Sequence, residues 1–178
     1  MDIKTKRVVR EWIESLVIAF ILAMIIRAFI VQAFKIPTSS MAPTLKQGDR
    51  ILVNKFIYRF QDPQRWDVIV FKYPLDQKRD FIKRLVAREG DKVTIENGRV
   101  LIDNNLVDNP YLSEYYYNRG PQGQEGKEID VPQDNFYVLG DNSLNSQDSR
   151  YWGFVPQKNL VGKAFLIYWP PNRIRIIR

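Results

Sequence analysis

The stretch Ile36-Pro37-Thr38-Ser39-Ser40-Met41-Ala42-Pro43-Thr44-Leu45 separates a long apolar segment from the rest of the chain. Proline fixes φ and moves the residue before it away from helical geometry, so Pro37 and Pro43 are expected to bracket a rigid bend. Several hydroxyl groups lie within this bend. The stretch is therefore a suitable place to hold a nucleophilic serine.

The 178-residue chain contains no histidine and no cysteine. A Ser-His-Asp triad, a cysteine nucleophile, a Cys/His zinc site and a disulfide framework are therefore excluded. If a serine attacks a substrate, its base must be a lysine or a carboxylate. A lysine has an ordinary pKa near 10.4, so holding it neutral at pH 7 costs about 4 to 5 kcal/mol. Burial beside apolar side chains can shift the pKa by that amount.

The best candidate lysine lies in Asp80-Phe81-Ile82-Lys83-Arg84-Leu85-Val86, which alternates like a strand. On a strand, Phe81, Lys83 and Leu85 share one face and Arg84 points to the other. Lys83 would then lie between two large apolar neighbours. Considered alone, such a lysine more often extends to water. The serine bend favours the alternative, in which Lys83 is a buried base.

Residues 16–34 are apolar apart from Arg27 and Gln32, which makes the segment long enough to cross a bilayer. A charge at mid-bilayer is costly, so the crossing helix is expected to begin near Val8 or Arg10 and to end near Arg27. Residues 29–36 would then begin the folded domain as a strand. The expected division is an N-terminal region and transmembrane anchor over 1–27, and an exported domain over 28–178.

Basic residues before this segment predict a cytoplasmic N-terminus and an exported C-terminal domain. Two alternatives remain: a signal peptide cleaved near Val31 and Ala33, or a buried core helix. The net charge of +7 is compatible with nucleic acid. The anchor and the lack of a nucleic-acid motif favour anionic lipid as the partner instead.

From Arg50 onward the pattern is mostly β, with short apolar runs separated by turn residues. The expected strands are residues 51–53, 68–72, 81–87, 93–95, 100–102, 136–139 and 164–169. Asn97-Gly98 predicts a two-residue hairpin, and residues 103–105 predict another turn. Residues 110–132 are expected to form a long surface excursion, in which Tyr115-Tyr116-Tyr117 is either a binding patch or the packed base of the loop.

Five stretches, taken in order behind the apolar segment, resemble the ordered sequence boxes of bacterial type I signal peptidases. These stretches are residues 40–45, 48–53, 65–71, 80–84 and 140–156. The resemblance implies a single N-terminal transmembrane helix followed by an all-β catalytic domain. It also implies a membrane-bound serine endopeptidase that removes signal peptides from exported preproteins, without a metal or cofactor, at the plasma membrane or an internal energy-transducing membrane.

The resemblance assigns Ser40 as the nucleophile and Lys83 as the general base of a Ser-Lys pair. It places the Thr38 hydroxyl in the oxyanion hole and gives Ser146 the role of orienting the lysine through a hydrogen bond. The residues expected to shape the loop behind the site are Gly140, Asp141, Asp148 and Arg150, the last two as a pair. The residues expected to line two small substrate pockets are Phe34, Pro37, Met41, Leu45, Ile51, Val70, Phe81 and Ile82.

The sequence leaves some alternatives open. Ser39 is a rival nucleophile beside Ser40, although the family commonly has glycine there. Ser143 and Leu144 occupy positions where many family members carry charges, and the excursion over residues 110–132 is expected to lie away from the chemistry. A self-cleaving repressor protease and a non-enzymatic, membrane-tethered β-domain that binds envelope partners are the other function classes considered.

Overall fold

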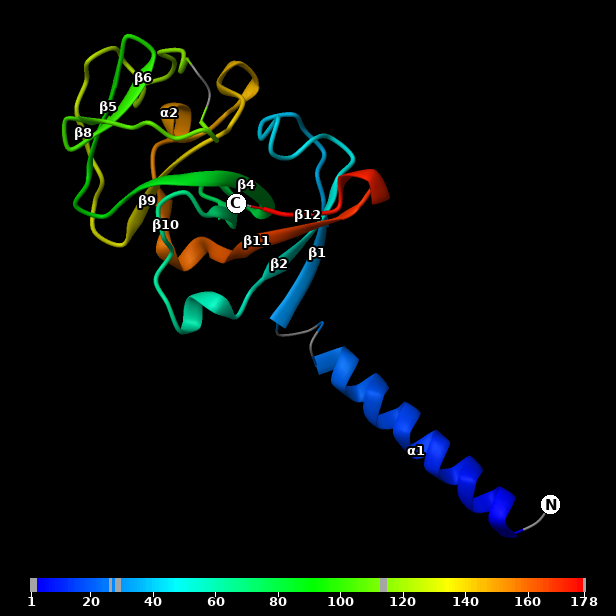
Figure 1. Cartoon of the computed structure of the whole chain (residues 1–178). Helices are drawn as coiled ribbons and strands as arrows, with labels where there is room; N and C mark the ends of the chain where they lie inside the picture. Colours follow the sequence, from blue (N-terminus) through cyan, green and yellow to red (C-terminus); the bar gives the residue numbers. More distant parts are fainter. Residues whose placement is uncertain (1–2, 26, 28–29, 113–114, 178) are drawn as a thin grey trace.

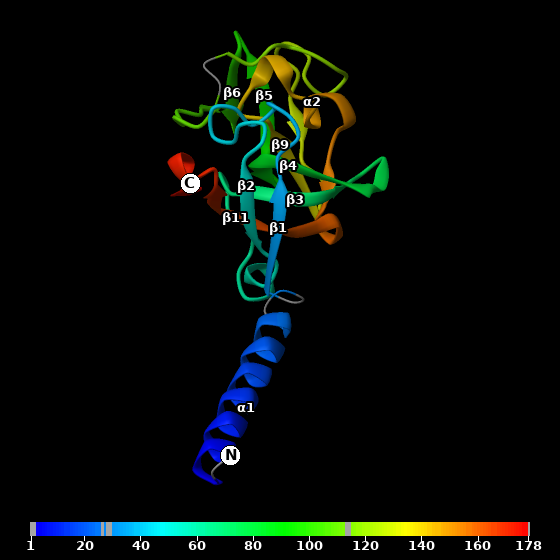
Figure 2. The ribbon, with the colours of Figure 1, turned by 90° about the vertical axis from the view of Figure 1, so that its right-hand side faces the viewer.

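The structure is a computed structural model and describes residues 3–25, 27, 30–112 and 115–177. A long helix, α1 (Ile3–Ile25), is followed by a domain made almost wholly of β-strands. The helix projects away from that domain, whereas the C-terminus lies against it (Figure 1). A view from the side shows the same separation (Figure 2). The predicted fold class is therefore confirmed for the β domain.

The larger sheet carries the strands that flank the bend. Within the described residues its order is β1 (Val31–Lys35), β2 (Arg50–Asn54), β11 (Leu160–Trp169), β3 (Val68–Tyr73), β4 (Asp76–Arg88), β9 (Asn135–Leu139) and β10 (Val155–Pro156). Strand β12 (Arg175–Ile176) pairs with β11. All the sheet pairings are antiparallel, and β4 leads directly toward the second sheet.

The second sheet has the order β7 (Asn105–Leu106), β6 (Arg99–Ile102), β5 (Lys92–Glu96) and β8 (Ile129–Asp130). Asn97 and Gly98 have φ values of 50° and 74°, which are the left-handed values of the predicted two-residue hairpin turn. Asp103 and Asn104, with φ values of 52° and 62°, make the other predicted turn. The short helices are η2 (Ile57–Arg59), η3 (Ser143–Asn145), α2 (Ser149–Trp152), η4 (Gln157–Asn159) and η5 (Pro171–Arg173).

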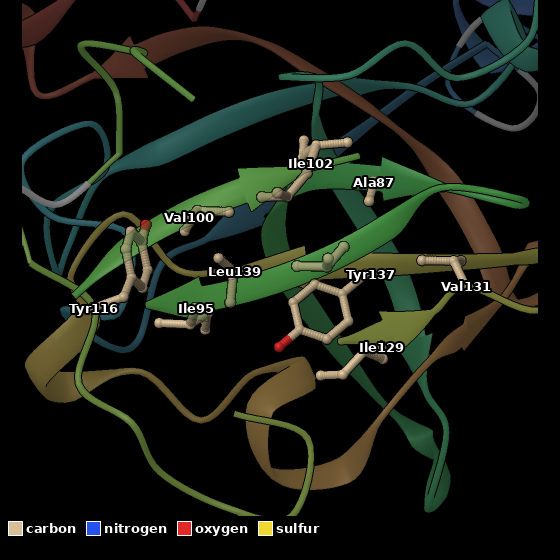
Figure 3. Close-up of a cluster of buried hydrophobic side chains, with 11 residues drawn as sticks. Ala87, Ile95, Val100, Ile102, Tyr116, Ile129, Val131, Tyr137 and Leu139 are labelled. Carbon is tan, nitrogen blue, oxygen red and sulfur yellow. The ribbon is translucent and has the colours of Figure 1, made fainter. Parts of the chain in front are cut away.

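The apolar side chains of the strands form separate buried clusters. One cluster lies between the second sheet and strands β4 and β9, and includes Ile95, Tyr116, Tyr137 and Leu139 (Figure 3). Another cluster packs the bend residues Met41 and Leu45 against Ile51 and Val70. These four side chains are only 0 to 2% exposed. The bend is therefore anchored in the core of the larger sheet.

The helix α1 differs from the predicted anchor. No helix in the described residues is long and apolar enough to cross a membrane. Arg10, Glu11 and Glu14 lie within α1, near the predicted start of the crossing. The predicted start of the strand at Phe29 lies outside the described residues. Strand β1 covers the remainder of that expectation.

Candidate active site

The bend is fastened to the start of β2 by backbone hydrogen bonds. The N–H of Ile36 donates to the carbonyl of Asp49 at 2.8 Å, and the N–H of Gly48 donates to the carbonyl of Ile36 at 2.9 Å. Within the second half of the bend, the N–H of Leu45 donates to the carbonyl of Met41 at 2.7 Å. The backbone around Ser40 is therefore fixed at both ends.

Ser40 and Lys83 come together from different parts of the sheet. The Nζ atom of Lys83 donates a hydrogen bond to Oγ of Ser40 at 2.6 Å, and the two residues are only 4% and 6% exposed. Lys83 lies opposite Ile69 in the pairing of β4 with β3, which fixes the position of its backbone. Ser39 is exposed. The geometry therefore favours Ser40 over Ser39 as the group that the lysine can activate.

Burial changes the protonation of this lysine. Removal from water lowers the pKa of Lys83 to about 8, while the negative charges of Asp148 and Asp141 act in the opposite direction and Arg150 lowers it further. The ring centroid of Phe81 lies 5.8 Å from Nζ, so one wall of this environment is aromatic. An amine in this state is neutral in a useful fraction of molecules near neutral pH.

Thr38 lies beside the same oxygen. Its Oγ1 is 3.3 Å from Oγ of Ser40, and either hydroxyl can be the donor. A hydroxyl at this distance can turn toward a second oxygen held next to Ser40. Thr38 therefore presents a second hydroxyl group next to the Ser40 oxygen.

Ser146 does not make the predicted hydrogen bond. Its Oγ is buried and has no hydrogen-bond partner in the described part of the chain, so the expected bond to Lys83 is absent. The Ser146 side chain lies against Gly140. A Cβ placed on Gly140 would lie 2.2 Å from Oγ of Ser146 and 2.5 Å from the carbonyl oxygen of Ser40. Gly140 thus allows the two serines to approach each other.

Two buried ion pairs lie behind the site. Asp148 pairs with Arg150 at 2.8 Å, as predicted, and both side chains are 0% exposed. Asp141 receives two hydrogen bonds from Arg84, at 2.8 and 2.7 Å. Arg84 was not among the predicted site residues, although its alternation on β4 places it on the face opposite Lys83. This strand therefore carries Lys83 on one face and a buried, paired arginine on the other.

The excursion packs against the loop that carries Gly140 and Ser143. The hydroxyl of Tyr116 donates to the carbonyl of Gly140 at 3.0 Å, and the N–H of Tyr117 donates to Oγ of Ser143 at 3.0 Å. Tyr116 is 1% exposed, so it is the packed base of the loop. Tyr116 packs against apolar residues of the second sheet, which brings the excursion next to the loop that carries Gly140. This contact joins residues far apart in the chain, so the local sequence does not predict it.

A cleft of about 510 Å³ opens over the Ser40 and Lys83 pair. Its lining residues are Pro37, Thr38, Ser40, Arg79, Asp80, Phe81, Ile82, Lys83, Asn145 and Gln147. Three of the predicted pocket residues, Pro37, Phe81 and Ile82, are among them. The other predicted pocket residues, Phe34, Met41, Leu45, Ile51 and Val70, belong to the hydrophobic cluster behind the bend. They support the cleft from the core, since four of them are nearly fully buried.

The part of the chain that the structure describes holds no group of three or more acidic side chains placed to bind a metal ion. The cleft holds a hydroxyl beside a partly neutral amine. This arrangement on a β domain defines the class of serine hydrolases in which a lysine takes the place of histidine.

Comparisons with known proteins identify the family within that class. Residues 9–169 match the family described as signal peptidase, peptidase S26. The chain is 39% identical over 175 residues to the probable signal peptidase I-2 of Synechocystis, covering 93% of this chain and 77% of that protein. It is 41% identical over 172 residues to the signal peptidase I of Leptolyngbya laminosa, covering 92% and 81%. The chain therefore belongs to the signal peptidase I family.

A relative from a plant organelle matches as well. The chloroplastic thylakoidal processing peptidase 1 of Arabidopsis thaliana is 32% identical over 166 residues, covering 88% of this chain and 47% of that protein. Members of this family are serine endopeptidases that process signal peptides.

Proposed function

We propose that this chain is a serine endopeptidase that removes signal peptides from exported preproteins, with Ser40 as the nucleophile and Lys83 as its general base. One observation carries the proposal. The Lys83 amine and the Ser40 hydroxyl are 2.6 Å apart, buried, and open onto a cleft with apolar walls. Membership in the signal peptidase I family supports the choice of substrate.

In the first half of the reaction, neutral Lys83 accepts the proton of Ser40 while Oγ of Ser40 bonds to the carbonyl carbon of the scissile peptide. The carbonyl oxygen gains the negative charge. The backbone N–H of Ser40 and the hydroxyl of Thr38 donate hydrogen bonds to this oxyanion. The rigid bend matters here because donors that are already in position need no reorganisation when the charge forms.

The intermediate then collapses and the C–N bond breaks. The Lys83 ammonium gives its proton to the departing amine, which becomes the new N-terminus of the mature protein, and an ester to Ser40 remains. In the second half, Lys83 accepts a proton from water as the water oxygen attacks the ester carbon. The bond between that carbon and Oγ of Ser40 then breaks, the signal peptide leaves as a carboxylic acid, and the Lys83 ammonium returns the proton to Ser40. Each proton transfer uses the same nitrogen, so the base must regain its neutral form in every cycle.

The cleft favours small apolar residues near the cut. Pro37, Phe81 and Ile82 supply apolar surface close to Ser40. Phe34, Met41, Leu45, Ile51 and Val70 form the packed layer behind that surface. A packed apolar wall excludes large side chains by overlap and gains little energy per methylene, so we infer preference for residues such as alanine one and three positions before the cut.

For location, the family implies a membrane. We infer a single membrane attachment through the N-terminal segment, with the N-terminus in the cytoplasm and the catalytic domain on the exported side of the plasma membrane or an internal energy-transducing membrane. The supporting observation is the exposure of apolar side chains along α1, among them Leu16, Phe20 and Leu22, each more than half exposed. Membrane lipid would cover that surface.

Incubation of the purified full-length chain with a preprotein in detergent tests the proposal. The expected product is the mature protein, cut after a small residue, and Ser40→Ala and Lys83→Ala should each abolish cleavage. Matched controls are Ser39→Ala, which removes the neighbouring exposed hydroxyl, and Lys92→Ala, which removes a lysine of the second sheet. Near-normal turnover by Lys83→Ala would show that the base is misassigned.

A further inference from the structure

We propose that Arg79 makes the cleft select substrates with an acidic residue about four positions from the bond that is cut. The inference rests on the proposed function and names a specificity that Ser40 and Lys83 do not explain. Arg79 lines the same cleft as Ser40, on strand β4 and on the same face as Phe81 and Lys83. It is exposed, so an incoming substrate can reach it.

An aromatic platform holds the Arg79 side chain. Its guanidinium carbon lies 5.3 Å from the ring centroid of Phe81 and 5.9 Å from that of Tyr73. These two rings are stacked with centroids 4.3 Å apart and planes at 6°. Trp152 braces Tyr73 from the side, with centroids 5.8 Å apart. Stacking restricts an exposed arginine, so less conformational entropy is lost when it binds a carboxylate.

The charge on Arg79 is available for a substrate. None of the ion pairs found in the described residues includes Arg79. Asp80, beside it, pairs with Lys72 at 2.7 Å. Asp76, in the same hairpin, accepts a hydrogen bond from the N–H of Lys78 at 3.1 Å. Apart from Lys83, Arg79 is the charged residue of the cleft lining for which the described structure records no ion pair.

The spacing along β4 sets the position of the selected residue. Residues 76–83 pair with β3, and the pairing of β4 with β9 begins only at Arg84, so one edge of this segment is open in the described structure. A substrate that extends along this edge advances one residue for each residue of β4. Arg79 precedes Lys83 by four residues, or about 13 Å at 3.3 Å per residue. The carboxylate it contacts therefore lies about four residues from the scissile bond.

A peptide scan tests this inference. The full-length chain in detergent is given a neutral parent peptide with a small residue at the cut, and then peptides with a single Glu at each position from five before to five after the cut. We expect Glu about four residues from the cut, on one side, to raise kcat/KM about two- to fivefold at low salt, the range for an exposed ion pair. The gain should disappear at high salt.

Variants identify the arginine. In Arg79→Gln, the ratio of kcat/KM for the Glu peptide to kcat/KM for the neutral peptide should fall to about one, and Arg79→Glu should favour Lys at the same position. Arg59→Gln is the matched control, because Arg59 also stacks on a phenylalanine, Phe56, at 5.5 Å but lies outside the cleft lining. A gain that persists in Arg79→Gln, or a scan without any preferred position, would overturn the inference while leaving the peptidase function intact. Failure of the unsubstituted chain to cut the neutral peptide would overturn both this inference and the proposed peptidase function.

Discussion

At the scale of single residues, the proposed mechanism depends on one buried amine, Nζ of Lys83, whose charged form is disfavoured by burial. Lys83 has its pKa lowered to about 8, and the cause acting in that direction is chiefly the loss of water around Nζ. Two nearby carboxylates resist this change, yet burial outweighs them. The residue is therefore protonated at low pH and becomes a competent base as the pH rises.

The lowered pKa of Lys83 predicts how the cleavage rate depends on pH. Because the neutral amine accepts the proton of Ser40, kcat/KM should rise with pH and level off above about 8, with the acidic limb reporting the free enzyme. The measurement is cleavage of an uncharged peptide from pH 5 to pH 10 in one buffer system. Activity that stays constant between pH 5 and pH 7 would show that Lys83 is not the group that titrates.

Ser146 gives a second prediction at this scale. Its buried hydroxyl has no hydrogen-bond partner among the described residues, so replacing it removes a desolvated group without removing a bond. Ser146→Ala should therefore leave the free energy of unfolding unchanged or raise it by about 1 kcal/mol. If the hydroxyl bonds to Lys83 during the reaction, kcat should fall at least tenfold. Denaturant unfolding and kinetics on the same preparation separate these effects, and loss of stability would contradict the structural reading.

At the scale of elements, β4 joins the chemistry to the core. Lys83 faces the cleft, while the next residue, Arg84, is 0% exposed and bonds to Asp141 on the loop after β9. The same guanidinium donates to the carbonyl of Trp66 at 2.7 Å. The loop that carries Gly140 is therefore fixed to the strand that carries the base.

Removal of one partner in this buried pair should be costly. Asp141→Ala should lower the free energy of unfolding by about 3 to 5 kcal/mol, because Arg84 would remain charged and buried. The control is Glu128→Ala, which breaks an exposed pair with Lys92 at 2.6 Å and should cost much less, because water screens both charges. Urea unfolding monitored by tryptophan fluorescence compares them. If the two variants lose equal free energy of unfolding, burial does not determine how much each ion pair contributes to stability.

The sequence predicts elements better than it predicts their contacts. Alternation gave the long strands and turn chemistry gave the hairpin at Asn97-Gly98, because both are local properties. The two-residue strands β7, β8, β10 and β12 are too short for alternation to register. The pairing of Arg84 with Asp141 and the contact of Tyr116 with Gly140 join residues far apart in the chain, and only the assembled sheets bring them together.

At the scale of the whole molecule, the helix and the β domain are separate in structure. The described clusters of buried apolar residues contain no residue of α1. The helix projects from the base of the domain in both views (Figures 1 and 2). The domain therefore has its own core and does not depend on the helix for packing.

Removal of residues 1–27 should separate attachment from chemistry. The shortened chain should keep the melting temperature of the β domain and cut a short peptide at a rate within about threefold of the full chain, since no cleft residue is lost. It should no longer sediment with vesicles that contain anionic lipid. The experiment compares both chains in the same vesicle assay. Sedimentation of the shortened chain would place the attachment on the β domain instead.

The short connection between α1 and the bend has a geometric consequence. Ser40 follows the last residue of α1, Ile25, by 15 residues. A fully extended chain of that length spans at most about 50 Å. If lipid holds the helix, Ser40 stays within about 50 Å of the membrane surface. The length of this connection therefore limits how far from the bilayer a substrate bond can be cut.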